Sequence, residues 1–261
     1  MRKINSTFLF RIFIFLFVFS CRYPTATKQA NVNEQALHHS YYDDSTLNNN
    51  LLPVLMPFNR IISPAGSVIK WGNKNMEQHS LDIKPIPGTH WLAVEERNGI
   101  IIIDTQKKDV IAQWNYRDNK PYNKLKSTYS GIFVWQKNNE TYIFWSAANG
   151  KESRVLQAKW DGKKIAVIND FELKPEGKSP LALPNEVAVN TENGKDYLYV
   201  VLNGNNQLVK LDIGTKEIVW ERETGVAPYG ITLMDNKLYV TNWAGPQPPD
   251  DTKEETAGVP Y

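Results

Sequence analysis

The amino-acid sequence predicts an all-β fold of the β-propeller class. After Pro53, short runs rich in Val, Ile, Trp and Tyr alternate with turns rich in Gly, Asn, Asp and Pro, which is the pattern of strands and hairpins. That region shows no long amphipathic helical period. The runs also recur every 40 to 57 residues, roughly, with about four strands to a unit, which is typical of propeller blades.

The clearest copy of the repeat spans residues 91–114 and reads WLAVEERNGIIIIDTQKKDVIAQW. Its first two apolar runs are joined by a turn containing Asn98-Gly99, a strong hairpin signal because both residue types tolerate a positive φ. A polar turn after Asp104 and a strand ending in Trp114 complete the copy. Residues 198–220, LYVVLNGNNQLVKLDIGTKEIVW, repeat the same order. We therefore expect both segments to form consecutive antiparallel strands of a blade.

A further copy lies between these two, over residues 141–168. The aspartate that ends the third strand of a four-stranded unit falls at Asp104, Asp161 and Asp212. We expect each of these carboxylates to accept hydrogen bonds from the backbone of its own turn. Their role is therefore predicted to be structural.

The two ends of the repeat region are expected to be incomplete. Residues 184–189 open one copy, and residues 228–242 open another in the same way and end with Tyr239-Val240-Thr241-Asn242. Residues 58–72 give a partial leading piece, and the final residues are rich in Pro and charge. Closed rings usually have about four to eight blades. Residues 53–261 therefore predict about three whole blades plus partial ones, and we expect the chain to be the N-terminal part of a longer protein.

Residues 1–21 predict a lipoprotein signal peptide. A basic start precedes an apolar run over residues 12–19, which is too short for a transmembrane span of about 20 residues. Val18-Phe19-Ser20-Cys21 resembles a lipobox, in which the cysteine is lipidated, and Cys21 is the only cysteine of the chain. An ordinary export signal with an incidental cysteine is the alternative. Residues 22–52 are polar and aperiodic, which predicts a flexible tether.

The expected location is therefore the bacterial cell envelope, in the periplasm or at the outer membrane, with Cys21 as the lipid anchor to the membrane. The net charge of +2 provides no basic face for nucleic acid, so no nucleic-acid partner is expected. A single cysteine excludes a disulfide within the chain and a zinc site built from several cysteines.

Tyr239-Val240-Thr241-Asn242 resembles the motif that names the YVTN family of YncE-like β-propeller repeats, a WD40-like type. The wider likeness rests on residues 59–66, 79–82, 91–96, 240–246 and 257–261. Together these segments resemble the front half of envelope proteins that fuse such a propeller to an alkaline-phosphatase-like phosphoesterase domain. The resemblance implies a propeller and an envelope location. In that family the metal ligands and the nucleophile belong to the C-terminal domain, so they are not carried over to this chain.

The sequence contains no recognisable catalytic set. Glu95 and Glu96 are adjacent, and on a strand they point to opposite faces, which argues against a catalytic pair. The four histidines have no Gly-X-Ser-X-Gly partner, and no phosphate-binding loop or metal-ligand spacing is present. We therefore expect a binding or scaffolding module, without enzyme activity, cofactor or metal in this chain.

A lactonase-like hydrolase is the alternative function. Propellers of that class hold a divalent ion in the central channel with Glu, Asn and Asp side chains from several blades. The candidate channel residues are Asn185, Glu186, Asn203 and Asn242. Their other interpretation is that they satisfy the backbone at turns and strand ends, which we favour.

A module that binds a protein or a glycan on the propeller face is the third possibility. Trp71, Trp135, Trp145 and Trp243 are candidates for exposed contacts, although burial in the core is expected for most of them. Trp114, Trp160 and Trp220 are instead expected to pack between neighbouring blades.

Overall fold

The computed structural model describes residues 54–56, 58, 60–62, 68–72, 76–177, 179–247 and 249. The chain divides into two compact units, Met1–Val68 and Ile69–Tyr261. In the first unit, β1 (Val54–Met56) pairs antiparallel with β2 (Arg60–Ile62). The predicted signal peptide, the proposed lipidation site Cys21 and the predicted tether over residues 22–52 lie outside the described residues.

The second unit consists of four antiparallel sheets in its described part, which we number as blades 1 to 4. Blade 1 comprises β3 (Ser80–Pro85), β4 (Trp91–Glu96), β5 (Gly99–Asp104) and β6 (Asp109–Asn115). Blade 2 comprises β7 (Lys126–Lys137), β8 (Glu140–Ala148), β9 (Ser153–Trp160) and β10 (Ile165–Leu173). Blade 3 comprises β11 (Pro184–Glu192), β12 (Lys195–Leu202), β13 (Gln207–Asp212) and β14 (Ile218–Glu223). Blade 4 has two described strands, β15 (Pro228–Met234) and β16 (Lys237–Asn242).

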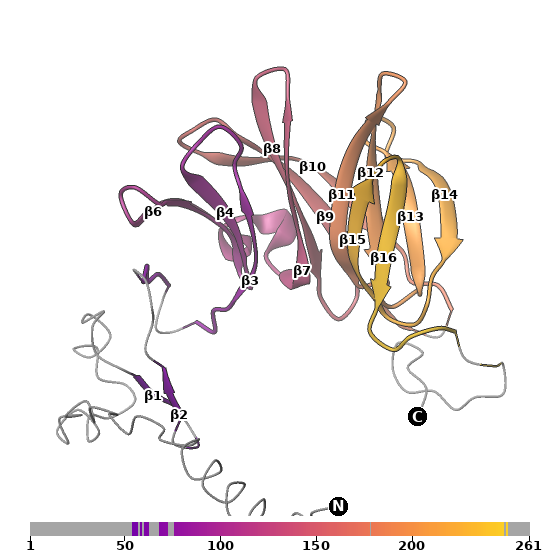
Figure 1. Cartoon of the computed structure of the whole chain (residues 1–261), viewed down its shortest axis with the longest axis horizontal. Helices are drawn as coiled ribbons and strands as arrows, with labels where there is room; N and C mark the ends of the chain where they lie inside the picture. The colour runs from indigo at the N-terminus through magenta and orange to yellow at the C-terminus, as the bar shows by residue number, and fades with distance from the viewer. Residues whose placement is uncertain are drawn as a thin grey trace, which may run out of the picture. The chain divides into compact units, whose positions relative to one another are not determined.

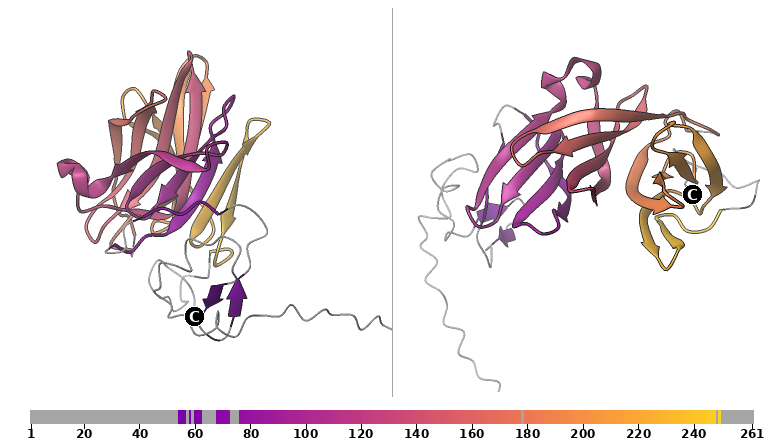
Figure 2. Two further views of the ribbon diagram at one scale, coloured as in Figure 1. Left: turned by 90° about the vertical axis from the view of Figure 1, so that its left-hand side faces the viewer. Right: turned by 90° about the horizontal axis from the view of Figure 1, so that it is seen from above.

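Each blade is a meander, because its strands are hydrogen-bonded in the order in which they follow along the chain. The blades succeed one another from β3 to β16 in Figure 1, and they can be followed from above in Figure 2. Two short 3-10 helices, η3 (Tyr116–Asp118) and η4 (Lys120–Tyr122), connect blade 1 to blade 2. The predicted all-β, propeller-like architecture with three whole blades is confirmed, and the predicted partial blade at the C-terminal end corresponds to β15 and β16. Of the predicted partial leading piece over residues 58–72, the structure describes the strand β2, which pairs with β1.

In blades 1 and 2 the structure adds an innermost strand that the repeats found in the sequence did not include. The innermost strands β3 and β7 precede the apolar runs from which the repeats were recognised. The first hairpin also differs in detail, since its turn lies at Arg97 and Asn98, and Gly99 is already the first residue of β5. Gly99 has a φ of +155°, and a Cβ there would lie 1.9 Å from the carbonyl oxygen of Trp114.

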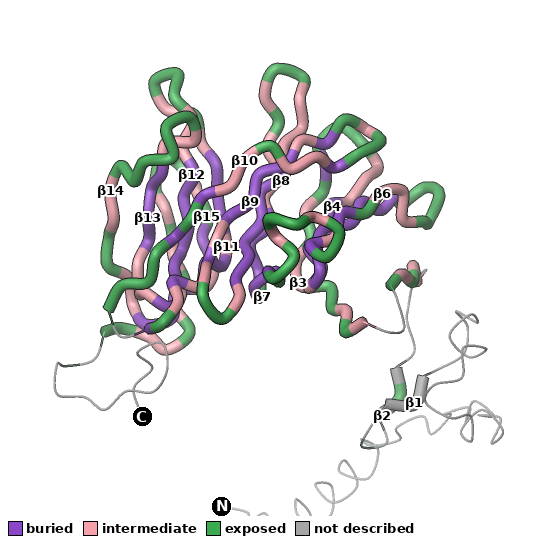
Figure 3. The backbone as a smooth tube through the Cα atoms, turned by 180° about the vertical axis from the view of Figure 1, so that it is seen from behind, coloured by how far each residue is buried: buried purple, intermediate pink, exposed green. Residues whose placement is uncertain are grey.

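Three hydrophobic clusters join successive blades. One lies between blades 1 and 2 and contains Trp145, another lies between blades 2 and 3 and contains Phe144, and a third lies between blades 3 and 4 and contains Tyr199. Buried residues accordingly run along the middle strands, whereas several turns, such as residues 105–108, are exposed (Figure 3). Each fully buried large side chain contributes about 1.5–3 kcal/mol to stability. The blades are therefore held to their neighbours mainly by these clusters.

The predicted structural roles of the repeat residues are confirmed. Asp104, Asp161 and Asp212 each accept hydrogen bonds from the backbone N–H groups two and three residues ahead, at 2.7–3.1 Å. Trp114 and Trp160 belong to the cluster between blades 1 and 2, and Trp220 packs against the cluster between blades 3 and 4.

The innermost strands of successive blades lie next to one another, in the pairs β3–β7, β7–β11 and β11–β15. At one end of these strands are the turns after β4, β8, β12 and β16 and the connections between blades. We call this side of the second unit the loop end. It positions the candidate site described next.

Candidate functional site

A recess of about 520 Å³ opens at the loop end, between blades 1 and 2. It is lined by His79, Ser80, Leu81, Arg97, Lys126, Ser127, Thr128, Tyr129, Ala148, Asn149 and Leu183. Most of these residues are the first residues of β3 and β7 or follow directly after β4 and β8. Its volume falls in the range of small-molecule pockets, which is roughly 300–1,000 Å³.

A buried hydrogen-bond chain fixes one side of the recess. The hydroxyls of Tyr116 and Ser127 are 3.0 Å apart, and the Trp145 Nε1–H donates to the Tyr116 hydroxyl oxygen at 2.9 Å. Burial raises the pKa of the Tyr116 hydroxyl, so the group keeps its proton. The Ser127 hydroxyl is therefore held in place by a neutral network anchored in the core.

Two cations, Arg97 and Lys126, lie among the lining residues, and none of the lining residues is a carboxylate. Glu77, outside the lining, binds the Arg97 Nε at 3.3 Å and the His79 Nε2 at 3.1 Å. The hydrogen bond from His79 and the charge of Arg97 lower the pKa of Glu77. Lys126 donates to the side-chain oxygen of Asn98. The lining itself thus has a positive formal charge.

The backbone around these cations is held by Glu96. Its carboxylate accepts hydrogen bonds from the N–H groups of His79, at 3.1 Å, and Asn98, at 2.9 Å. The Arg97 N–H donates to the His79 carbonyl at 2.9 Å, and the Arg97 carbonyl accepts from Ser127 at 3.0 Å. Charge-assisted hydrogen bonds are about twice as strong as neutral ones. This part of the rim is therefore well supported.

Three aromatic side chains continue the recess toward blade 4. Tyr229 and Trp243 are stacked, with ring centroids 4.4 Å apart and planes inclined by 14°. Tyr129, a lining residue, has its ring 6.4 Å from that of Trp243, and its carbonyl accepts a hydrogen bond from the Tyr229 hydroxyl at 3.1 Å. Tyr129 is 63% exposed and Trp243 is 66% exposed. We call these three residues the aromatic shelf.

Acidic side chains from β3, β4 and β11 lie close to one another, and Lys84 and Glu186 line a separate cavity of about 450 Å³. Lys84 on β3 binds Glu186 on β11 at 3.0 Å and Asp82 at 3.7 Å. Glu95 on β4 is fully buried, and neither of its carboxyl oxygens has a hydrogen-bond partner among the described residues. Burial raises the pKa of Glu95 well above its usual value, and the charges of Asp82 and Glu186 raise it further. Burial also raises the pKa of Glu186, which Lys84 partly counteracts.

No hydrogen bond within the described residues joins any two of the four predicted channel residues. Glu186 is bound to Lys84, and Asn203 donates to the Pro228 carbonyl at 3.2 Å. Asn185 is buried, with its carbonyl accepting from the Ser146 hydroxyl. The buried side-chain oxygen of Asn242 has no hydrogen-bond partner in the described part of the chain.

The tryptophans that were candidates for exposed contacts divide into two groups. Trp145 is fully buried, and Trp71 and Trp135 are partly buried, so these three belong to the packing of the blades. Trp243 is exposed and belongs to the aromatic shelf. Burial of most members of this set was expected.

Sequence reasoning missed three features of the site. Arg97 and Lys126 are ordinary surface residues in the sequence, and no motif marks them. Tyr129 is brought to Trp243 by the fold, although more than a hundred residues separate them. The position of Glu95 could have indicated a buried acid, because this residue directly follows the apolar run Leu92-Ala93-Val94 within the same strand.

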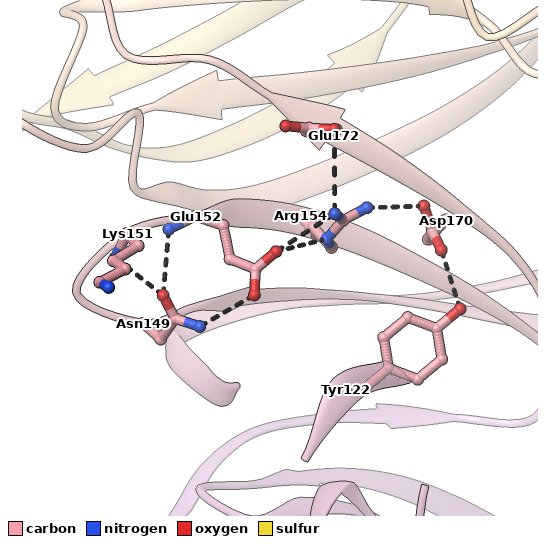
Figure 4. Close-up of polar contacts among 7 residues, drawn as sticks. All are labelled: Tyr122, Asn149, Lys151, Glu152, Arg154, Asp170 and Glu172. Carbon is pink, nitrogen blue, oxygen red and sulfur yellow. Dashed lines mark hydrogen bonds and ion pairs between the residues drawn. The ribbon is translucent and has the colours of Figure 1, made fainter. Parts of the chain in front are cut away.

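A second polar cluster lies on the outer strands of blade 2 (Figure 4). Arg154 on β9 binds Glu152 at 3.1 Å, Asp170 at 3.0 Å and Glu172 at 3.8 Å. The Tyr122 hydroxyl donates to Asp170 at 2.8 Å. Burial and the bond to Asp170 raise the pKa of Tyr122 to about 12. The hydrogen bond from Tyr122 to Asp170, which Arg154 also binds, fastens η4 to blade 2.

Within the described residues, no three His, Cys, Asp or Glu side chains are grouped as a metal site would require. The same residues include no helix with the length and apolar character needed to span a membrane.

No protein-family model matches the sequence, and neither does any curated protein. Among solved structures, the chain is similar to a protein of unknown function from Bacteroides caccae, with 11% sequence identity and a TM-score of 0.44. That match covers 61% of this chain and 51% of the other. The chain is also similar to the dihydro-heme d1 dehydrogenase NirN in complex with DHE, with 8% identity, a TM-score of 0.40 and coverage of 62% and 32% respectively. The matches span about half and about a third of those structures. The fold assignment rests on the sheet topology.

Proposed function

We propose that this chain is a binding module of the bacterial cell envelope, which uses the loop end of its blades to bind a ligand and Cys21 to attach to the membrane. The observation that carries the binding role is the continuity of the 520 Å³ recess with the exposed aromatic shelf through Tyr129. Stacked aromatics exposed beside a recess that carries charged side chains are typical of a recognition surface rather than of a core.

Export and lipidation rest on the N-terminal sequence, and one variant tests them. The full chain is expected in the membrane fraction, resistant to salt and released by detergent. Stable anchoring takes about two acyl signals, and a bacterial lipoprotein typically has them on its cysteine. Cys21→Ser removes the site of these acyl chains and is therefore expected to move the protein to the soluble fraction. Recovery of both forms in the same fraction would contradict the lipid anchor.

The binding role is tested separately, by the effect of ligand on the melting temperature. Fractions of envelope extract that stabilise the full chain should not stabilise the double variant Tyr129→Ala/Trp243→Ala, because a ligand stabilises only the state that binds it. The matched control is Met234→Ala/Tyr239→Ala, which removes two exposed side chains from β15 and β16 outside the aromatic shelf. Stabilisation of all three proteins to the same extent would exclude the loop end as the binding site.

Membership of the YVTN family and the link to a phosphoesterase rest on the resemblance of the residues quoted above. In this proposal the chain has no catalytic set of its own, and a phosphoesterase domain in the same gene product would be the catalytic part. Blotting envelope fractions with an antibody to the blades tests this: a band well above 29.9 kDa supports the fusion. A band near 29.9 kDa in every fraction would exclude the fusion to a phosphoesterase domain.

The lactonase-like hydrolase remains the second candidate because of Glu186 and its acidic neighbours Asp82 and Glu95, although within the described residues these carboxyl groups are not grouped as a metal site would require. The ion pair of Glu186 with Lys84 counts against it, because the ammonium group occupies the position beside the carboxylates. A bound divalent ion would raise the melting temperature, and a chelator would lower it again. An unchanged melting temperature with EDTA and with added Ca²⁺ would exclude this candidate.

A further inference from the structure

We propose that the ligand of the loop end is an anionic saccharide at least two sugar rings long, bound with one ring against the aromatic shelf and its acidic group at Arg97 and Lys126. This inference rests on the proposed binding role and specifies the chemistry of the ligand. It follows from the geometry of the shelf, the charge of the recess and the distance between them.

The aromatic shelf has the shape that a sugar ring requires. A pyranose ring has a flat face of C–H groups with hydroxyls around its edge, and it therefore packs on an exposed aromatic face while its edge stays hydrated. Tyr229 and Trp243 support each other by stacking, with their planes inclined by only 14°. The backbone N–H of Trp243 donates to the Ala227 carbonyl at 3.0 Å, and the Tyr229 hydroxyl donates to the Tyr129 carbonyl. The shelf is thus pre-organised, so little conformational entropy is lost on binding.

The recess beside the shelf suits an acidic group with hydroxyls around it. Arg97 and Lys126 are the charged lining residues, apart from the titratable His79, and no carboxylate lines the recess. The guanidinium of Arg97 is bound to Glu77 through Nε, and no hydrogen bond of its two terminal nitrogens is found among the described residues. A planar guanidinium with two free nitrogens is suited to a carboxylate or sulfate. Ser127, Thr128 and Asn149 provide hydroxyl and amide groups for the sugar hydroxyls.

The two parts of the site are joined along β7. Lys126 and Tyr129 are three residues apart, so their Cα atoms are separated by at most about 10 Å, and the pairing of β7 with β8 is irregular between Ser127 and Ile132. We take this span as that of two linked rings, one on the shelf and one at the cations. Arg97 and Lys126 already have Glu77 and Asn98 as partners, so a neutral sugar gains nothing from their charge, whereas an acidic group adds a charge-assisted contact.

The test is titration of the full chain with an oligogalacturonate trimer, with binding measured by Trp fluorescence and by calorimetry. The neutral control is the same trimer with its carboxylates reduced to alcohols. We expect the acidic trimer to bind about tenfold or more tightly than the reduced one, with an affinity that falls as salt is added. A sulfated trisaccharide in a parallel titration distinguishes a preference for carboxylate from a preference for sulfate.

Three variants separate the parts of the site. Trp243→Ala is expected to weaken binding of both trimers by about tenfold or more. Arg97→Gln/Lys126→Gln is expected to bring the acidic trimer to the affinity of the reduced one. Lys163→Gln, in the turn at the opposite end of blade 2, and Tyr239→Ala are the matched controls and are expected to bind as the unmodified chain does. Circular dichroism of each variant verifies that it is folded.

Two results would overturn the proposal. One is that none of the acidic saccharides binds a folded full chain. The other is that binding occurs but survives both Trp243→Ala and the double cation variant. If envelope material still stabilises the unmodified chain and not Tyr129→Ala/Trp243→Ala, the proposed binding function stands and the saccharide assignment alone is wrong. If neither material binds, both fall.

Discussion

Glu95 is a carboxylic acid within a strand whose other central residues are apolar, and it has no hydrogen-bond partner among the described residues. The polar groups that act on it are Asp82 and Lys84 on β3, Ser127 on β7 and Glu186 on β11. Because the folded state raises its pKa, the folded state also binds its proton more tightly than the unfolded chain does. Stability that depends on this proton is present at acidic pH and is lost as the pH rises.

Glu95→Gln is expected to remove this dependence. Near pH 4 both side chains are neutral and similar in shape, so the free energies of unfolding should be close. Above the ordinary pKa of 4.5, the unmodified chain should lose stability by up to about 1.4 kcal/mol per pH unit until Glu95 ionises, and the variant should not. Urea unfolding between pH 4 and pH 8 measures the difference. Parallel pH profiles for the two proteins would contradict the buried, protonated state.

Glu96→Gln is the informative control for that experiment. Glu96 accepts two backbone hydrogen bonds, from His79 and Asn98, so its replacement is expected to destabilise the protein. Unlike Glu95→Gln, this variant is not expected to become more stable than the unmodified chain as the pH rises. The two adjacent glutamates, both buried, thus differ in their hydrogen bonding.

At the scale of whole strands, Gly131 on β7 lies where this strand comes close to β11. A Cβ at this position would lie 2.1 Å from the carbonyl oxygen of Asn185 on β11 and 2.6 Å from the Ser146 Oγ. Gly131 also has a φ of +125°, which side-chain-bearing residues rarely adopt. Its N–H lies 3.4 Å from the Asp82 carboxylate on β3. The absence of a side chain at Gly131 thus lets β7 lie close to β11, and its N–H links β7 to β3.

Gly131→Ala is expected to cost about 3 kcal/mol or more of unfolding free energy, because both the backbone conformation and the neighbouring backbone resist the added methyl group. Gly150→Ala is the matched control, since a Cβ there would meet no atom within 4 Å, and its effect should stay within about 0.5 kcal/mol. Denaturant titration of both variants measures these values. Equal stabilities would show that β7 can move away from β11 without penalty.

The sequence predicted the blades because their signals are local. Asp104, Asp161 and Asp212 act within their own turns, and the tryptophans at strand ends follow the repeat. The candidate site was only partly predictable, since its parts meet through contacts between blades that no local pattern encodes. Trp243 was named in advance, whereas Tyr129 and Arg97 were not. Gly131 illustrates the same limit, because the need for glycine arises from a carbonyl group on another blade.

At the scale of the second unit, burial is unevenly distributed among the blades. The second half of β8 and most of β12 are buried, whereas exposed and partly buried residues alternate along β16. In the described part of the chain, β16 pairs only with β15. Local stability follows the number of buried contacts and paired backbone groups.

Hydrogen exchange of the full chain is therefore expected to rank these strands. Amides of β8 and β12 should exchange only in the globally unfolded state, over hours or longer, whereas those of β16 should exchange through local opening in seconds to minutes. Mass spectrometry of peptic peptides resolves the three segments. Protection of β16 equal to that of β8 would mean that β16 has a further strand or partner beside it in the whole protein.

The meander order of the strands has a consequence for how such a chain changes over generations. Every whole blade is encoded by one uninterrupted stretch of sequence, and it packs mainly against the blades that come before and after it. Copying one such stretch of the gene would insert a blade that is already complete, without rerouting any other strand. Tandem duplication followed by divergence is thus open to this architecture, and the similar copies within residues 91–220 are what such a history leaves behind.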